Sequence, residues 1–142
     1  MAKGAIKPAG YSGTPLVKKL GMKKDYRVRV VNQPANYFQL LGELPAGLRV
    51  SKDTRRGKDL IHCFLTSTKE LSRTLPALKS EIEQAGSIWI SWPKKSSGVE
   101  TDITEDVVRR AAFAIGLVDV KVCAIDETWS GLKLVIPVKD RR

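Results

Sequence analysis

The sequence predicts an α/β fold: a three-layer, Rossmann-like sheet that is mostly parallel and carries a C-terminal antiparallel hairpin. Apolar runs of strand length alternate with amphipathic helical stripes along the chain, the order found in sheets covered by helices on both faces. The run from Leu60 to Leu65 is almost uninterrupted, as in a central strand buried on both sides. The last two apolar runs are joined by the turn ETWSG at residues 127–131, which is typical of a hairpin.

The N-terminal end predicts an arm followed by a short helix. Residues 1–12 are rich in Gly, Ala, Lys and Pro, so we expect a flexible basic arm there and a single α/β domain over residues 13–142. Thr14 is suited to an N-cap, Pro15 to the first helical position and Gly21 to the C-terminal stop. These residues predict a helix of one to two turns.

The next segment predicts a strand, a short helix and a second strand. Residues 26–31 alternate between apolar and basic side chains, which is a strand pattern. Asn36 can cap a helix that ends before Pro45. Residues 48–51 are expected to form a short strand, and the polar segment KDTRRGKD at residues 52–59 a loop.

The central segment predicts a capped helix and a buried strand. Ser67 and Glu70 have the spacing of a capping box. The apolar stripe of the helix that follows extends to Ala85, and Gly86 is its expected end. SIWISW at residues 87–92 then predicts a strand.

The last third predicts one more helix and the hairpin. Thr104 and the two acidic residues after it form a helix N-terminus, since they satisfy backbone amides and favour the positive end of the dipole. Gly116 ends this helix. Residues 118–126 and 132–138 form the two strands of the hairpin.

The strand order predicts where a ligand would bind. In open α/β sheets, ligands bind outside the carboxyl ends of the parallel strands. The segment WPKKSSGVETD at residues 92–102 and the ETWSG turn should therefore lie on the same edge. Lysine and tryptophan together could hold a phosphate or carboxylate attached to a flat ring; alternatively, the tryptophans close the core and the lysines pair with surface carboxylates. The candidate ligand-binding residues are Trp92, Lys94, Lys95, Asp126, Trp129 and Ser130.

The distribution of charge suggests a second kind of partner. The chain has a formal net charge of +10. Residues 1–30 hold eight basic residues and one acidic residue, and residues 49–58 hold five and one. These clusters could bind nucleic acid through its phosphates, although a solvated tail and loop would have the same composition. The candidate residues for this alternative are Lys3, Lys7, Lys18, Lys19, Arg49, Arg55 and Arg56.

Several kinds of site are not supported by the sequence. The one histidine, His62, and the two cysteines, Cys63 and Cys123, lie in strand-like apolar runs without metal-ligand spacing, so neither a metal site nor a disulfide is expected. His62 is expected to be a core histidine with its hydrogen bonds satisfied. Ser91 and Lys94 have the S-x-x-K spacing without the other motifs of that class. No catalytic residue is therefore assigned.

The sequence also lacks nucleotide-binding motifs and membrane signals. The turn VVNQPANYF at residues 30–38 contains no glycine, whereas a dinucleotide site needs glycines there, and no P-loop is present. No apolar run has the length of a membrane span, and the N-terminal residues do not resemble a signal peptide. We therefore expect a cytoplasmic protein with no membrane partner.

Three blocks of sequence resemble a known family: GYSGTPLVKKLG, WPKKSSGVETDITEDVVR and GLVDVKVCAIDETWSGLKLVIP. They are similar to a family of small bacterial proteins catalogued as a domain of unknown function, and the resemblance covers nearly the whole chain. It implies no activity and no catalytic residue. A fold-level resemblance, from Asp59 onward, is to the second half of Rossmann-type methyltransferases. The glycine-rich turn that holds S-adenosylmethionine in that class has no counterpart after Val31.

Together these observations predict a non-enzymatic cytoplasmic α/β domain that binds a small anionic ligand or a protein partner at the carboxyl edge of its sheet. The alternatives are nucleic-acid binding through the basic arm and the 49–58 loop, and a diverged methyltransferase-like enzyme. No particular cofactor and no oligomeric state follow from the sequence.

Overall fold

The computed structural model describes residues 14–142. The predicted basic arm, with its candidate residues Lys3 and Lys7, lies outside the described residues. Within residues 14–142, no helix is long and apolar enough to cross a membrane. No group of three or more His, Cys, Asp or Glu side chains among these residues could hold a metal ion. Cys63 and Cys123 are both free thiols.

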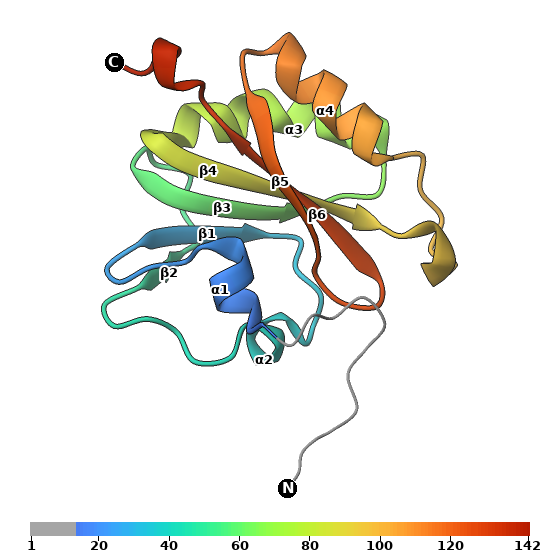
Figure 1. Cartoon of the computed structure of the whole chain (residues 1–142), viewed down its shortest axis with the longest axis horizontal. Coiled ribbons are helices and arrows are strands. Elements are labelled where there is room, and N and C mark those ends of the chain that lie inside the picture. The colour runs from blue at the N-terminus through green and yellow to red at the C-terminus, as the bar shows by residue number, and fades with distance from the viewer. Residues whose placement is uncertain (1–13) are drawn as a thin grey trace, which may run out of the picture.

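The sheet has six strands in the order β2-β1-β3-β4-β6-β5 (Figure 1). The first four strands along the chain pair in parallel. The last strand, β6, is antiparallel to both of its neighbours, β4 and β5. This arrangement confirms the predicted Rossmann-like, mostly parallel sheet with a C-terminal antiparallel hairpin. The strands are β1 (Arg27–Val31), β2 (Arg49–Ser51), β3 (Lys58–Phe64), β4 (Ile82–Pro93), β5 (Val118–Ala124) and β6 (Trp129–Val135).

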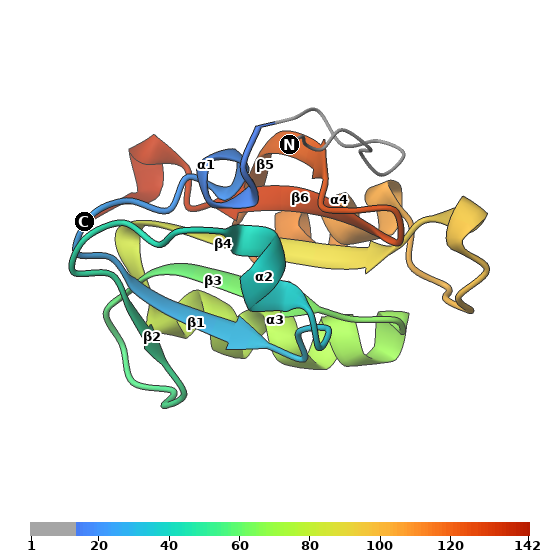
Figure 2. The same ribbon diagram turned by 90° about the horizontal axis from the view of Figure 1, so that it is seen from below.

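Helices cover both faces of the sheet and make the three layers (Figure 2). Two short helices pack on one face and two longer helices on the other. The short helices are α1 (Leu16–Leu20) and α2 (Tyr37–Leu41), and the longer ones are α3 (Thr68–Glu81) and α4 (Glu105–Ala114). Two single turns of 3₁₀ helix, η2 (Lys95–Ser97) and η3 (Val138–Asp140), complete the elements.

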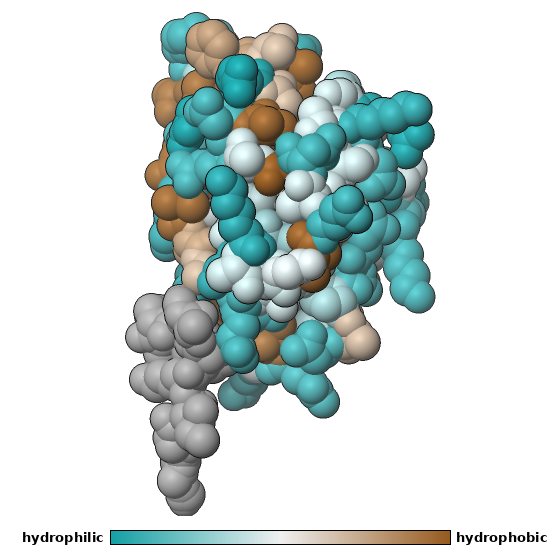
Figure 3. Space-filling view, turned by 90° about the vertical axis from the view of Figure 1, so that its right-hand side faces the viewer, coloured by the Kyte–Doolittle hydropathy of each residue, from teal (hydrophilic) through white to brown (hydrophobic). Residues whose placement is uncertain are grey.

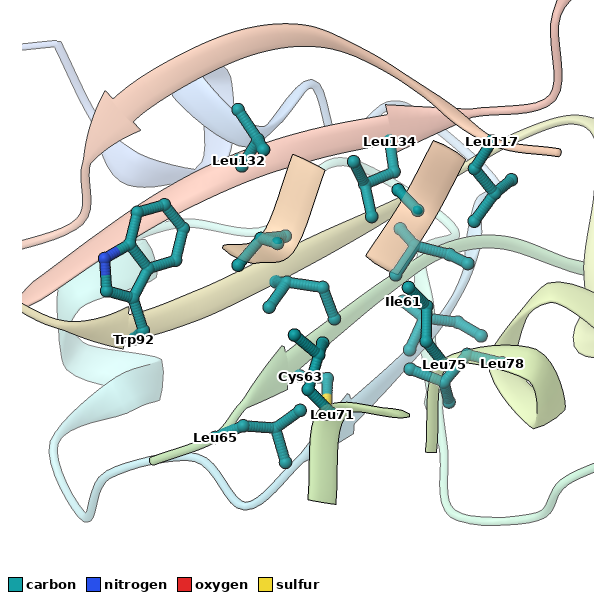
Figure 4. Close-up of a cluster of buried hydrophobic side chains, with 14 of the residues drawn as sticks. Ile61, Cys63, Leu65, Leu71, Leu75, Leu78, Trp92, Leu117, Leu132 and Leu134 are labelled. Carbon is teal, nitrogen blue, oxygen red and sulfur yellow. The ribbon is translucent and has the colours of Figure 1, made fainter. Parts of the chain in front are cut away.

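Each face of the sheet has its own hydrophobic core. The helical stripe of α3, formed by Leu71, Leu75 and Leu78, is fully buried against β3, β4 and α4, as its spacing predicted. Figure 4 shows these side chains from α3 meeting those of the strands. β3 contributes alternate residues to the two cores and is buried almost throughout, which confirms it as a central strand.

The caps of the longer helices are those that the sequence predicted. The Ser67 hydroxyl accepts a hydrogen bond from the Glu70 amide. The Thr104 hydroxyl does the same for the Val107 amide. The N-cap of α1 is Pro15, one residue after the predicted one. Asn36 is the N-cap of α2, as predicted, but its side chain makes no capping hydrogen bond.

The end of α3 departs from the sequence-based prediction. The apolar stripe predicted a helix through Ala85, but Ile82 already has extended backbone (φ −84°, ψ 151°) and begins β4. Ile82 pairs with Lys58 of β3, so hydrogen bonding to the neighbouring strand replaces the last helical turn. Gly86 lies inside β4, where an added Cβ would come within 2.9 Å of the Lys58 carbonyl oxygen. Its role is close backbone approach, not helix termination.

Candidate functional site

The carboxyl edge of the sheet brings together the two segments that the sequence placed there. The amide of Lys94 donates to the Thr128 carbonyl at 2.8 Å. In the register of β4 and β6, Trp92 pairs with Ser130 and Pro93 pairs with Trp129. Figure 3 faces this edge and shows polar side chains interspersed with apolar ones.

The two tryptophans at this edge point to opposite faces of the sheet. Trp92 is buried in the core under α3 and α4, at the end of that cluster (Figure 4). Trp129 packs on the other face against Phe64, with ring centroids 5.0 Å apart and the planes at 90°. The two indoles therefore do not form a shared platform for a flat ligand. They close the tops of the two cores, which is the alternative that the sequence left open.

The polar residues of this edge have mixed roles. The Asp126 carboxylate accepts hydrogen bonds from the amides of Thr128 and Trp129, each at 2.8 Å, so it shapes the hairpin turn. Lys94 is half-buried and Lys95 is exposed. Neither ammonium group forms an ion pair with another residue of the described chain. A ligand role for these residues stays a prediction.

Below this edge lies a buried polar chain of three side chains. The Tyr37 hydroxyl is 2.8 Å from Nδ1 of His62, and Nε2 of His62 is 2.7 Å from the Ser91 hydroxyl. All three side chains are fully buried. Burial lowers the pKa of His62 to about 3 and raises the pKa of Tyr37. His62 is therefore a neutral core histidine with both ring nitrogens satisfied, as predicted, and it has no access to a substrate.

A cavity of about 330 Å³ lies at the other end of the strands. Three of its residues, Arg27, Arg49 and Lys58, are the first residues of β1, β2 and β3. It therefore lies at the amino edge, whereas the sequence analysis placed the ligand site at the carboxyl edge. Five basic side chains and one carboxylate line it. The lining residues are Arg27, Arg49, Ser51, Asp53, Arg55, Arg56 and Lys58; we call it the basic cavity.

Two arginines of the basic cavity lie side by side, and neither is ion-paired with another of the described residues. Arg27 and Arg49 are directly opposite in the parallel register of β1 and β2. Within residues 14–142, neither guanidinium group forms an ion pair or a hydrogen bond. Like charges that face each other across neighbouring strands are destabilising. The cavity thus contains two guanidinium groups that form no ion pair with the described residues, although the Asp59 carboxylate accepts a hydrogen bond from the Arg27 amide at 2.8 Å.

The remaining groups form a hydrogen-bonded loop around Asp53. Its carboxylate accepts from the Ser51 hydroxyl at 2.6 Å, from the Lys58 ammonium at 3.0 Å and from the Arg55 amide at 2.9 Å. The Ser51 hydrogen bond, followed by that of Lys58, holds the pKa of Asp53 far below its usual range. Lys58 is only 3% exposed and also donates to the Arg55 carbonyl at 2.6 Å. Asp53 is therefore charged at neutral pH, and its carboxylate accepts the hydrogen bond that holds Lys58.

The predicted nucleic-acid residues are only partly brought together. Arg49, Arg55 and Arg56 line the basic cavity, but Lys18 and Lys19 lie on α1, which packs on the opposite face of the sheet. Arg27 and Lys58 were not among the predicted nucleic-acid residues. The alternation in residues 26–31 gave the available signal, because it placed Arg27 on the face opposite to the apolar side chains.

Comparisons with known proteins identify the class of fold. A solved S-adenosylmethionine-dependent methyltransferase from Aquifex aeolicus is similar over 85% of this chain and 87% of its own, with a TM-score of 0.61 and 15% identity. DhpI in complex with SAH matches over 84% and 81%, with a TM-score of 0.59 and 8% identity. A ribosomal-protein methylase from Lactobacillus delbrueckii matches over 85% and 74%, with a TM-score of 0.53 and 13% identity. The chain therefore has a Rossmann-like methyltransferase fold.

These comparisons establish the fold and no closer relationship. No family model matches the chain, and no curated protein matches its sequence. The resemblance to a bacterial family of unknown function therefore stays a prediction. The similarity of fold agrees with the weaker of the two resemblances in the sequence, the one to methyltransferases.

The Aquifex aeolicus protein of similar fold depends on S-adenosylmethionine, and a nucleoside cofactor of this kind requires particular residues around it. Rossmann-type sites use a glycine-rich turn after β1 and an acidic residue about 20 positions later. Here no glycine lies between Val31 and Gly42, and the Asn32 side chain bonds the Phe64 carbonyl at 3.2 Å. The acidic residue at the expected distance is Asp53, whose carboxylate is already engaged with Ser51, Arg55 and Lys58. The described residues do not fit a cofactor held in this way.

Proposed function

We propose that this chain is a diverged methyltransferase-like protein that works as a binding domain and holds an anionic, phosphate-bearing partner in the basic cavity. The observation that carries the proposal is the unpaired neighbours Arg27 and Arg49. A bound anion would remove the repulsion between them. Guanidinium groups suit this role because they bind phosphate through two parallel hydrogen bonds.

The surrounding groups support a site that is held in place before the partner arrives. Lys58 is fixed by Asp53 and by the Arg55 carbonyl, so less side-chain freedom is lost on binding. The arginines add further donors, whereas the Ser51 hydroxyl already donates its proton to Asp53. The lining carries five positive groups and one carboxylate. Its excess positive charge could neutralise at least two negative charges on a partner.

The test compares two double variants that change the net charge equally. Arg27→Gln with Arg49→Gln removes two charges at the basic cavity, and Lys94→Gln with Lys95→Gln removes two at the carboxyl edge. Binding of tripolyphosphate is measured by isothermal titration calorimetry at low salt. We expect the arginine variant to bind at least about tenfold more weakly, from the loss of charge-assisted hydrogen bonds, and the lysine variant to bind as the wild type does.

Two results would overturn the proposal. Equal weakening in both variants would mean that only net charge matters. Weakening in the lysine variant alone would return the site to the carboxyl edge, where the sequence analysis placed it. Thermal unfolding of both variants serves as the control that each is folded.

Methyl transfer is the second candidate, and the similarity of fold favours it. It requires that S-adenosylmethionine bind this chain, although the turn after β1 lacks the expected glycines. Calorimetric titration with S-adenosylmethionine and with S-adenosylhomocysteine separates the two candidates. Saturable binding with one site per chain would support methyl transfer. If neither compound binds, methyl transfer is ruled out and the proposal of a binding domain remains.

A further inference from the structure

We infer that the partner of the basic cavity is the phosphodiester backbone of a nucleic acid, held without readout of its base sequence. The inference rests on the proposed function, because the same arginines supply the contacts. It adds the chemical class of the partner and the path that the partner takes along the molecule. Three features of the amino edge support it.

The first feature is that basic groups continue beyond the cavity. A second cavity of about 560 Å³ lies at the same edge. Figure 1 shows that β3 and β4 begin at this edge and that the C-terminal residues return to it. Arg56 lines both cavities, and the second adds Lys79 and Arg142. Glu83 and Asp140 also line it, so its net charge is lower. The basic groups thus extend further than one phosphate needs, which suits a chain of phosphates.

The second feature is the open and polar character of the site. Arg55 has 84% of its side chain exposed, and no aromatic side chain lines either cavity. Sites for small molecules are usually enclosed and mostly apolar. A strand that lies across the surface needs neither property, because its phosphates can be contacted from one side.

The third feature is that guanidinium and ammonium groups, which can neutralise phosphates, dominate the lining, whereas no aromatic side chain lines either cavity. Single-stranded nucleic acid is commonly held by aromatic side chains that stack on the bases, and neither cavity provides them. Contacts to phosphate position a nucleic acid but carry no sequence information. The lining therefore predicts binding that depends on salt and is indifferent to sequence.

Arg27 and Arg49 are the centre of this site. Neighbouring strands are about 4.8 Å apart, so two long side chains that start from directly opposite positions can each contact a phosphate of the same backbone. Arg55 and Arg56 lie on the loop that follows β2 and can contact the adjacent phosphates. Replacing Arg27 and Arg49 should remove about two phosphate contacts.

The experiment measures the salt dependence of binding. Fluorescence anisotropy gives the affinity of the full chain for a labelled 20-nucleotide single strand and for a 20-base-pair duplex between 50 and 200 mM salt, so the two sources of phosphodiester are compared directly. We expect log Kobs to fall linearly with log salt. In the double arginine variant, the slope should become shallower by about two, one for each lost phosphate contact. The double lysine variant at residues 94 and 95 should keep the wild-type slope.

The outcomes separate this inference from the proposed function. If tripolyphosphate binds through Arg27 and Arg49 but neither oligonucleotide binds, the inference of a nucleic-acid partner is wrong and the proposed function stands. If none of the three binds, both fail. Equal slopes in the two double variants would also overturn the inference, as would an affinity that differs more than about tenfold between a homopolymer and a mixed sequence of equal length. A third variant, Arg27→Lys with Arg49→Lys, keeps the charge and should keep the slope.

Discussion

Arg29 of β1 and Glu81, the last residue of α3, form an ion pair whose side chains are only 18% and 6% exposed. The second carboxylate oxygen of Glu81 has no hydrogen-bond partner among residues 14–142. The pair joins the sheet to the end of the helix beside the basic cavity. It also explains why Arg29 does not contribute to that cavity, although it lies on the same face of β1 as Arg27.

Breaking this ion pair should destabilise the fold strongly. Arg29→Met leaves the Glu81 carboxylate buried without its partner, and we expect a loss of about 3 kcal/mol in the free energy of unfolding, because an unpaired buried charge keeps its desolvation penalty. The double variant Arg29→Met with Glu81→Leu should recover most of that loss. Urea denaturation of the single and double variants measures both values, and equal stabilities would show that the pair is not coupled.

Stability should depend on pH through His62. Its pKa is lowered from 6.5 to about 3 by burial, so the unfolded chain binds a proton that the folded chain does not between these values. The free energy of unfolding should therefore fall as pH falls below about 6.5, with a limiting slope of about 1.4 kcal/mol per pH unit. In His62→Gln this contribution should vanish between pH 5 and 6.5. An unchanged slope in that variant would assign the effect to other groups.

Removing the charge of Asp53 should strengthen nucleic-acid binding. Asp53→Asn keeps the shape of the side chain and raises the net charge of the basic cavity by one, so the affinity for a single-stranded oligonucleotide should rise about threefold, as expected for one exposed charge at short range. Anisotropy at one salt concentration is sufficient. A lower affinity would mean that the main role of Asp53 is to hold Lys58 and the loop in place.

Gly86 should not tolerate a side chain. In Gly86→Ala the new methyl group would lie 2.9 Å from the Lys58 carbonyl oxygen and 3.1 Å from that of Glu83, both of which are backbone atoms. We expect a loss of about 2 kcal/mol or more, the cost of overpacking. Gly98→Ala is the matched control: a Cβ there meets no atom within 4 Å, and only its positive φ of 79° adds strain. Its cost should be about 1 kcal/mol, so thermal unfolding should rank residue 86 as the more sensitive.

The fold could be read from local signals because those signals agreed with one another. The caps at Ser67 and Thr104 and the apolar run of β3 are properties of neighbouring residues, and the structure confirms each of them. The end of α3 could not be predicted from neighbouring residues, because Ile82 fits both the apolar stripe of a helix and the apolar pattern of a strand. Pairing with Lys58, which is 24 positions earlier in the chain, decides between them.

The location of the candidate site needed information that is not local. Lys94 and the ETWSG turn lie together, as the strand order predicted, since both follow strands that end at the same edge. The strand order did not predict that the two tryptophans face opposite ways. Arg27 and Arg49 are 22 positions apart, and each is unremarkable in its own strand. Only the register of β1 with β2 makes them neighbours. The register of two parallel strands cannot be predicted from the sequence of either strand alone.

The position of β6 has a consequence for how the sheet is completed during synthesis. β4 and β5 come earlier in the chain, yet each pairs with β6, which lies between them. Until residues 129–135 have left the ribosome, one edge of β4 has no partner and β5 has none at all. Exposed strand edges invite pairing with other chains. The nascent protein is therefore most vulnerable to aggregation just before its last strand emerges, and docking of that strand protects both neighbours in one step.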